Sequence, residues 1–175
     1  SKSGLGPPTL ASEHKILWSR HSHKEQGFPA EVRSLSPSDS AIMLAKFEIA
    51  SLLPKIHEPK RRVSSRTPNH SAVALWVSAG ATRILLGSDL EEIGDSECGW
   101  TAILESVVQL QDKASVYKIA HHGSSTAEHP RIWTDLLEPK PCAILTPFMH
   151  GRTMLPAPVD VARICGNTTR SFITA

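Results

Sequence analysis

The chain lacks several features that would assign it to a well-defined class of protein. No apolar run approaches the roughly 20 residues of a membrane-spanning helix. Residues 1–8 contain no apolar core of a secretory signal peptide. The three cysteines are an odd number without CxxC spacing, which argues against a disulfide framework. We therefore expect reduced thiols in a cytoplasmic protein.

Strong net charge is also missing. The formal charge at pH 7 is only +2, so a phosphate-bearing substrate would have to be attracted by local charge or by metal ions. With 175 residues, 40% of them hydrophobic, the chain suits about one domain with an ordinary core. Residues 1–29 are expected to form a largely irregular arm. The beginning at a serine and the end directly after a strand pattern indicate a fragment, or one of two chains.

The rest of the chain alternates strand and helix patterns. A helix is expected to begin within 36–39, where serine precedes an acidic first turn, and to stop at Pro54. Further helices are expected over 100–108, 130–137 and 158–165, and strands over 32–35, 71–77, 83–86, 115–120, 142–145 and 172–174. Both faces of 71–77 are apolar, which predicts a strand inside a layered fold. This order predicts an α/β layer architecture.

Two of these strands end in side chains that can bind metal. The run 84–86 leads through Gly87 and Ser88 to Asp89, and the run 116–120 leads to His121 and His122. This arrangement predicts one shared metal site. The two oxygens of Asp89 can reach two ions about 3.5–4 Å apart. Capping of the following turn is the alternative role for Asp89.

The histidine pair is followed by the small residues Gly123, Ser124 and Ser125. Neighbouring side chains at a strand end point in opposite directions, so one imidazole can bind metal while the other orients it or contacts substrate. Gly123 permits a sharp turn, and Ser124 can donate a hydrogen bond to an anion or to a group beside the metal. A histidine pair packed at a loop is the alternative.

Together, residues 85–89 and 118–124 resemble the C-terminal half of the metallo-β-lactamase fold. The likeness is strongest to the hydrolase domain of bacterial DNA-uptake channel proteins and its stand-alone relatives. Asn69, His70 and Ser71 match the Asn and Ser that often open the strand before the Asp-bearing one. The resemblance covers residues 30–175 and implies an αββα sandwich.

The resemblance also implies roles for individual residues. Asp89 would be the carboxylate that bridges two divalent ions, zinc or manganese, and His121 or His122 would be a ligand. His70 would be another ligand or a solvent-exposed residue at a strand edge. Whichever histidine of the pair is not a ligand would steady the scissile phosphate together with Ser124. Asn69 would bind substrate. Apart from the resemblance, the basic loop suggests that Arg61, Arg62 and Arg66 guide the nucleic-acid backbone, although a run of basic residues is often only a solvated face.

One departure from the family decides the partners we expect. The principal metal motif of the family, His-x-His-x-Asp-His in the N-terminal half, is absent, and His21-Ser22-His23 matches only its beginning. Loss of the metal fits poorly with an intact Asp89 and an intact histidine pair. We therefore expect the missing half to reside on another polypeptide or on a segment severed from this one. In bacterial defence systems similar hydrolases accompany trypsin-like proteases, which suggests proteolytic processing.

Two functions are compatible with the sequence. The first is a metal-dependent hydrolase that cleaves phosphodiesters, most readily DNA, through a metal-activated water. The second is a catalytically inactive half-sandwich that binds and regulates a partner through the exposed edge of its incomplete fold.

Overall fold

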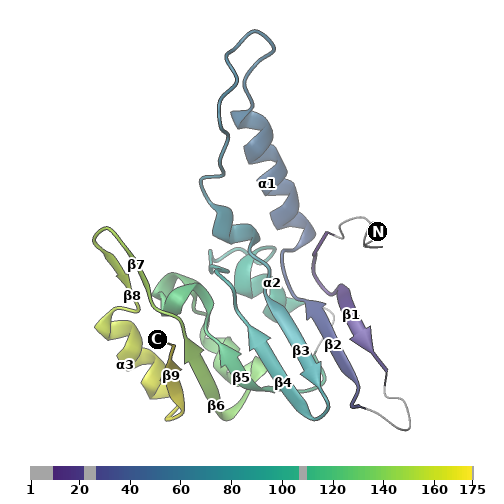
Figure 1. Ribbon diagram of the computed structural model, residues 1–175, viewed down its shortest axis with the longest axis vertical. Helices are drawn as coiled ribbons and strands as arrows, with labels where there is room; N and C mark the ends of the chain where they lie inside the picture. Colours follow the sequence, from purple (N-terminus) through teal and green to yellow (C-terminus); the bar gives the residue numbers. More distant parts are fainter. Residues whose placement is uncertain (1–9, 22–26, 107–109, 175) are drawn as a thin grey trace, which may run out of the picture.

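A computed structural model describes residues 10–21, 27–106 and 110–174 and shows a mixed α/β fold (Figure 1). The α-helices are α1 (Asp39–Leu52), α2 (Gly99–Glu105) and α3 (Pro158–Asn167). The strands are β1 (Ile16–Arg20), β2 (Ala30–Ser34), β3 (Leu75–Ala79), β4 (Thr82–Leu86), β5 (Ala114–Lys118), β6 (Leu137–Leu145), β7 (Phe148–His150), β8 (Thr153–Leu155) and β9 (Ser171–Ile173). Single helical turns are η1 (Pro68–Ser71), η2 (Ala120–Gly123), η3 (Ser125–Ala127) and η4 (Ile132–Leu136).

Seven strands of the described chain form one mixed sheet in the order β1-β2-β3-β4-β5-β6-β9. The strands from β1 to β4 pair antiparallel, and those from β4 through β9 pair parallel. The predicted hairpin of β3 and β4 is confirmed, with Leu75 opposite Leu86. Because β4 and β5 are parallel neighbours, the residues that follow their carboxyl ends lie at the same edge of the sheet.

The predicted strand over 71–77 begins later than expected, at Leu75. Ser36 takes the place of a neighbouring strand at this point, because its hydroxyl donates to the Ala72 carbonyl (2.7 Å) and accepts from the Ala74 amide (2.8 Å). The preceding residues form the helical turn η1 instead. This turn contains Asn69 and His70, which therefore lie beside the sheet edge and outside the strand ladder.

The helix predicted over 130–137 is confirmed over 130–136: residues 130 and 131 are α-helical, and Ile132–Leu136 continues them as a wider turn. It ends one residue earlier than expected, because β6 starts at Leu137. Pro139 and Pro141 follow closely, and proline can neither donate a backbone hydrogen bond nor continue a helix. The N-terminal arm also contains a strand that the sequence pattern did not predict, because Ile16–Arg20 pairs with β2. Residues 148–155 likewise form an unpredicted small hairpin of β7 and β8.

The predicted first helix is confirmed as α1. The Ser38 hydroxyl accepts from the Ala41 amide (3.1 Å) and caps its start, and α1 ends two residues before Pro54. Figure 1 shows α1 extending beyond the sheet, and Ala41 is its only buried residue. Its apolar residues Met43 and Phe47 are 58% and 66% exposed. None of the helices in the described ranges is long and apolar enough to cross a membrane.

The hydrophobic core lies on one face of the sheet. Trp76, Leu85, Tyr117 and Ala143 occupy one row across neighbouring strands and are all buried. Trp100 and Ile103 of α2, Ile132 and Leu136 of η4, and Ile164 of α3 belong to the same buried cluster. The Trp100 and Tyr117 rings meet edge to face, as do those of Tyr117 and Trp133. These helices therefore cover one side of the sheet.

The opposite face of the sheet is apolar but is not buried. Side chains alternate along each strand, so the residues between the core positions point to this second face. The apolar side chains among them are half-buried or exposed, and they are Trp18, Val32, Leu75, Val77, Ile84, Leu86, Val116, Cys142, Ile144 and Phe172. We call this set the open face. It extends from β1 to β9, across the full width of the sheet.

Because only one face of the sheet is buried, truncation of two adjacent residues is expected to change the free energy of unfolding by different amounts. Leu85→Ala removes a fully buried side chain (0% exposed) and is expected to lower the free energy of unfolding by about 2–5 kcal/mol. Leu86→Ala, on the open face, is expected to lower it by about 1 kcal/mol or less. Urea unfolding followed by circular dichroism measures both. Equal losses would mean that the open face is covered in solution.

Candidate functional site

The ends of β4 and β5 are tied together by backbone hydrogen bonds. The Gly87 amide donates to the Lys118 carbonyl (2.9 Å), and the His121 amide donates to the Ser88 carbonyl (2.8 Å). A Cβ atom on Gly87 would lie 2.7 Å from the Ala120 Cβ atom and 2.8 Å from the Ala120 nitrogen. Only glycine permits this close approach. The turn that bears Asp89 therefore lies directly against the turn that bears His121 and His122.

The histidines occupy an unusual backbone conformation. His121 (φ 42°), His122 (φ 56°) and Gly123 (φ 84°) are three consecutive residues in the left-handed region. This conformation costs a non-glycine residue about 1–3 kcal/mol and persists only where its surroundings enforce it. The turn carries the two adjacent imidazoles out of β5 at the sheet edge. Strain of this kind is concentrated at functional sites in proteins.

The ring of His122 is oriented by a backbone carbonyl. Its Nδ1 atom lies 2.8 Å from the Thr146 carbonyl oxygen, which can only accept, so Nδ1 carries a proton and donates. In the neutral imidazole, Nε2 is then the unprotonated nitrogen. Nε2 lies 3.6 Å from Asp89 Oδ1. The ring also stacks on Phe148, with ring centroids 4.9 Å apart, which fixes its plane.

The ring of His121 is oriented in the same sense by a carboxylate. Its Nδ1 atom lies 3.0 Å from Glu91 Oε1, so Nδ1 donates to this oxygen. Its Nε2 atom lies 3.4 Å from the amide nitrogen of Asn69, which is a donor, so the neutral ring accepts there through Nε2. Both histidines therefore have Nδ1–H held by an oxygen acceptor, and in the neutral form of each ring Nε2 carries the lone pair. This is the arrangement in which proteins present histidine as a metal ligand.

Glu91 is the site residue that sequence reasoning missed. Its Oε1 atom accepts from the Thr126 hydroxyl (3.0 Å) as well as from His121, and its Oε2 atom lies 3.8 Å from His70 Nε2. The sequence did contain a signal for it, because Glu91 follows Asp89 by two residues with an apolar residue between them. Leu90 is fully buried, so its neighbours Asp89 and Glu91 both point away from the core.

The structure brings together five of the residues singled out from the sequence: Asn69, His70, Asp89, His121 and His122. They come from η1, from the turn after β4 and from the turn after β5. The Ser124 hydroxyl, in contrast, accepts from the Thr126 amide (3.3 Å) and caps η3. Of the partial motif, His21 is exposed beyond β1, and His23 lies outside the described residues.

The three arginines lie elsewhere, in the loop that follows α1. This loop forms the tip of the projection in Figure 1 and returns to η1. Arg61 donates to the Leu52 carbonyl (3.4 Å), the Arg66 amide donates to Glu48 (2.6 Å), and Arg62 is exposed. The structure thus places these residues on the loop and not within the histidine cluster.

Lys118, the last residue of β5, supplies positive charge close to the site. Burial lowers the pKa of Lys118, while the carboxylate of Asp89 acts in the opposite direction. Its ammonium donates to the Ile119 carbonyl (3.3 Å). Lys118 lies between Leu86 and Ile144 of the neighbouring strands. It therefore places a positive charge on the same side of the sheet as the apolar residues of the open face.

The donors of the site suit zinc or manganese in kind, since both ions accept imidazole nitrogen and carboxylate oxygen. They are arranged as two separate sets, Asp89 with His122 and Glu91 with His121 and His70. Within the described ranges, no group of three or more His, Cys, Asp or Glu side chains is placed to hold an ion. Further donors would be needed for a closed or catalytic metal site.

Substitution of Gly87 tests its close contact with Ala120. Gly87→Ala forces the two turns apart and is expected to lower the free energy of unfolding by about 1–3 kcal/mol. It should also shift the ring nitrogen resonances of His121 and His122 in NMR spectra. Gly166→Ala is the control, because nothing lies within 4 Å of a Cβ atom there, and it should stabilise α3 by about 0.5–1 kcal/mol. Unchanged histidine resonances in Gly87→Ala would contradict the tie between the turns.

Comparison of the chain with protein-family models, with curated proteins and with solved structures found no match.

Proposed function

We propose that this chain is one half of a metal-dependent hydrolase of the metallo-β-lactamase fold, acting on phosphodiesters and most readily on DNA. The resemblance of residues 85–89 and 118–124 to that family motivates the fold and the substrate. Support from the structure comes from the contact of Asp89 with the histidine pair, because Asp89 lies 3.6 Å from His122 although 33 residues separate them in the sequence.

The orientation of the imidazoles carries this proposal. Two neighbouring histidines packed in a loop for structural reasons would have no need to present the same nitrogen. Here Nδ1 of His122 is held by the Thr146 carbonyl and Nδ1 of His121 by the Glu91 carboxylate. In its neutral form each ring therefore turns the lone pair of Nε2 away from its anchor, and Nε2 of His122 faces Asp89. A carboxylate or carbonyl behind each imidazole is typical of histidine that binds metal.

In this proposal Asp89 and one or both histidines of the pair contribute metal ligands, and His70 is a further candidate. Two divalent ions would lower the pKa of a bound water and neutralise the charge of a phosphate. Asn69 would contact substrate, because its side-chain amide is a hydrogen-bond donor beside His121. Lys118 would add positive charge beside Asp89. The arginines of the loop after α1 would guide the nucleic-acid backbone from outside the cluster.

The remaining ligands would come from a second polypeptide or a severed segment with the motif His-x-His-x-Asp-His, which a trypsin-like protease would separate. Two features of the structure support a partner. The open face is apolar over the whole width of the sheet, and a second sheet packed on it would complete a four-layer sandwich. Large apolar side chains of α1 are also exposed, namely Met43, Leu44, Phe47 and Ile49, and exposed apolar side chains that lie together are typical of a surface that binds another protein.

Substitution of the proposed bridging carboxylate tests the function. Asp89→Ala is expected to reduce divalent-ion-dependent nicking of supercoiled DNA by about a hundredfold or more, because the ions lose a ligand. The assay uses the protein together with its native partners, and the metal content of the same particle is measured by mass spectrometry. About two zinc or manganese ions per particle are expected.

Asp112→Ala is the matched control, because Asp112 is an exposed aspartate whose partner is Arg83 (2.8 Å) and not a histidine. It should retain normal activity. Full nicking by Asp89→Ala would refute the assignment. Absence of metal from the particle with every native partner present would favour the second function, a regulatory module that binds its partner through the exposed edge of its incomplete fold.

A further inference from the structure

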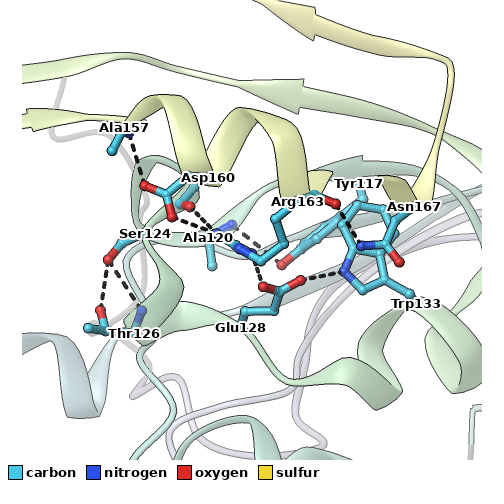
Figure 2. Close-up of polar contacts among 11 residues, drawn as sticks. Tyr117, Ala120, Ser124, Thr126, Glu128, Trp133, Ala157, Asp160, Arg163 and Asn167 are labelled. Atoms are coloured by element: carbon cyan, nitrogen blue, oxygen red, sulfur yellow. Dashed lines mark hydrogen bonds and ion pairs between the residues drawn. The ribbon is translucent and has the colours of Figure 1, made fainter. Parts of the chain in front are cut away.

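Arg163 of α3 reaches the turn that carries the two histidines. Its Nη2 atom donates to the Gly123 carbonyl (2.6 Å) and to Asp160 Oδ1 (3.0 Å), and its Nη1 atom donates to Glu128 Oε2. Figure 2 shows the guanidinium of Arg163 between the carboxylates of Asp160 and Glu128. Its side chain is only 26% exposed. The contact therefore joins α3 to the backbone immediately after His122.

Both carboxylates that hold Arg163 have anchors of their own. Asp160 is 4% exposed, and its second oxygen accepts from the Ala157 amide (2.9 Å) at the start of α3. The second oxygen of Glu128 accepts from the indole nitrogen of Trp133 (3.0 Å), as Figure 2 shows. A guanidinium fixed by two anchored carboxylates loses little further freedom when it binds a third acceptor. Arg163 is thus preorganised to hold the Gly123 carbonyl.

The hydrogen bond from Arg163 to the Gly123 carbonyl acts on a residue with little freedom to move. Gly123 is the last of the three left-handed residues, and a Cβ atom there would lie 2.7 Å from Leu145 Cδ2 and 3.2 Å from Ile164 Cδ1. Ile164 and Arg163 are adjacent on α3, so this helix contacts the turn twice. Ile164 packs against the Gly123 α-carbon region, and Arg163 fixes the direction of its carbonyl. Together they supply the constraint that a strained turn requires.

We propose that Arg163 is a positioning residue that sets the orientation of His121 and His122 through the Gly123 carbonyl. The proposal rests on the proposed function, because it assigns a purpose to the orientation of those rings. Arg163 itself touches neither ring. Its effect passes through the backbone of the turn, and Glu128 and Asp160 act by holding the guanidinium in place.

The test compares three variants of the full chain. Arg163→Gln removes the charged donors, Arg163→Lys restores a charged donor, and Arg83→Gln is a matched control. Arg83 also pairs with an aspartate, Asp112 (2.8 Å), and donates to a glycine carbonyl, that of Gly80 (2.7 Å). Gly80 lies in the turn of the β3–β4 hairpin and Asp112 lies just before β5, so both contacts are at the opposite ends of the strands from the histidines.

The principal measurement is long-range nitrogen–proton NMR of the imidazole rings without added metal. In the wild type, both His121 and His122 should show the tautomer with the proton on Nδ1. Arg163→Gln should lose this signature for both rings, and hydrogen exchange at the His121 and Ser124 amides should accelerate at least tenfold, while the unfolding transition stays cooperative. Arg163→Lys should restore part of both properties. Arg83→Gln should leave them unchanged.

Wild-type tautomers and exchange rates in Arg163→Gln would overturn the proposal, as would the same changes in Arg83→Gln. If Arg163→Gln does not fold, Glu128→Gln replaces it, because glutamine retains an acceptor for Trp133 and loses only the charge that holds Arg163. The rings should then show an intermediate loss of the Nδ1 tautomer, and unchanged rings would again refute the role.

A zinc titration of the same variants, each assembled with its native partners, separates this proposal from the proposed function. Arg163→Gln should weaken zinc binding at the histidine rings by about 10- to 100-fold, the usual effect of removing a group that orients a ligand. If the assembled wild type binds no zinc while the ring tautomers still depend on Arg163, the positioning role stands and the hydrolase assignment fails.

Discussion

The close contact between Gly87 and Ala120 is the constraint on which the site depends. It allows the Gly87 amide to reach Lys118 and the His121 amide to reach Ser88, so two turns distant in sequence become one surface. A side chain larger than hydrogen at position 87 would separate the carboxylate of Asp89 from the imidazole that faces it. The parallel pairing of β4 and β5 brings the strand ends to one edge, and the glycine brings them into contact.

Much of the fold could be predicted from local signals in the sequence. The cap of α1 at Ser38, the hairpin of β3 and β4 and the strand that leads to the histidines follow from residue type and short-range order. The errors arose where a distant residue decided the local structure. Ser36 supplies the hydrogen bonds that replace a strand partner for residues 72–74, and the pairing of β1 depends on β2, whose own sequence is only weakly periodic.

In the site, too, the residues determined by local sequence could be predicted and those determined by distant contacts could not. Asp89, His121 and His122 could be predicted because each follows an apolar strand, and parallel strands gather such residues at one edge. Glu91 was missed, although it lies two residues after Asp89 on the same side of the buried Leu90. Arg163 could not be predicted, because its role depends on how α3 packs against a turn forty residues earlier in the sequence. The displacement of the arginine loop from the histidine cluster follows from the projection of α1, which no local pattern indicates.

The edge strand β1 affects the solubility expected of this protein at high concentration. One side of its backbone pairs with β2, and the other borders no strand of the described sheet, while all five of its residues are exposed, including Ile16, Leu17 and Trp18. A border of this kind is a template on which another extended segment can add by main-chain pairing. Concentrated preparations of the isolated chain will therefore tend to aggregate through this end of the sheet, and charged residues introduced there would keep the protein dispersed.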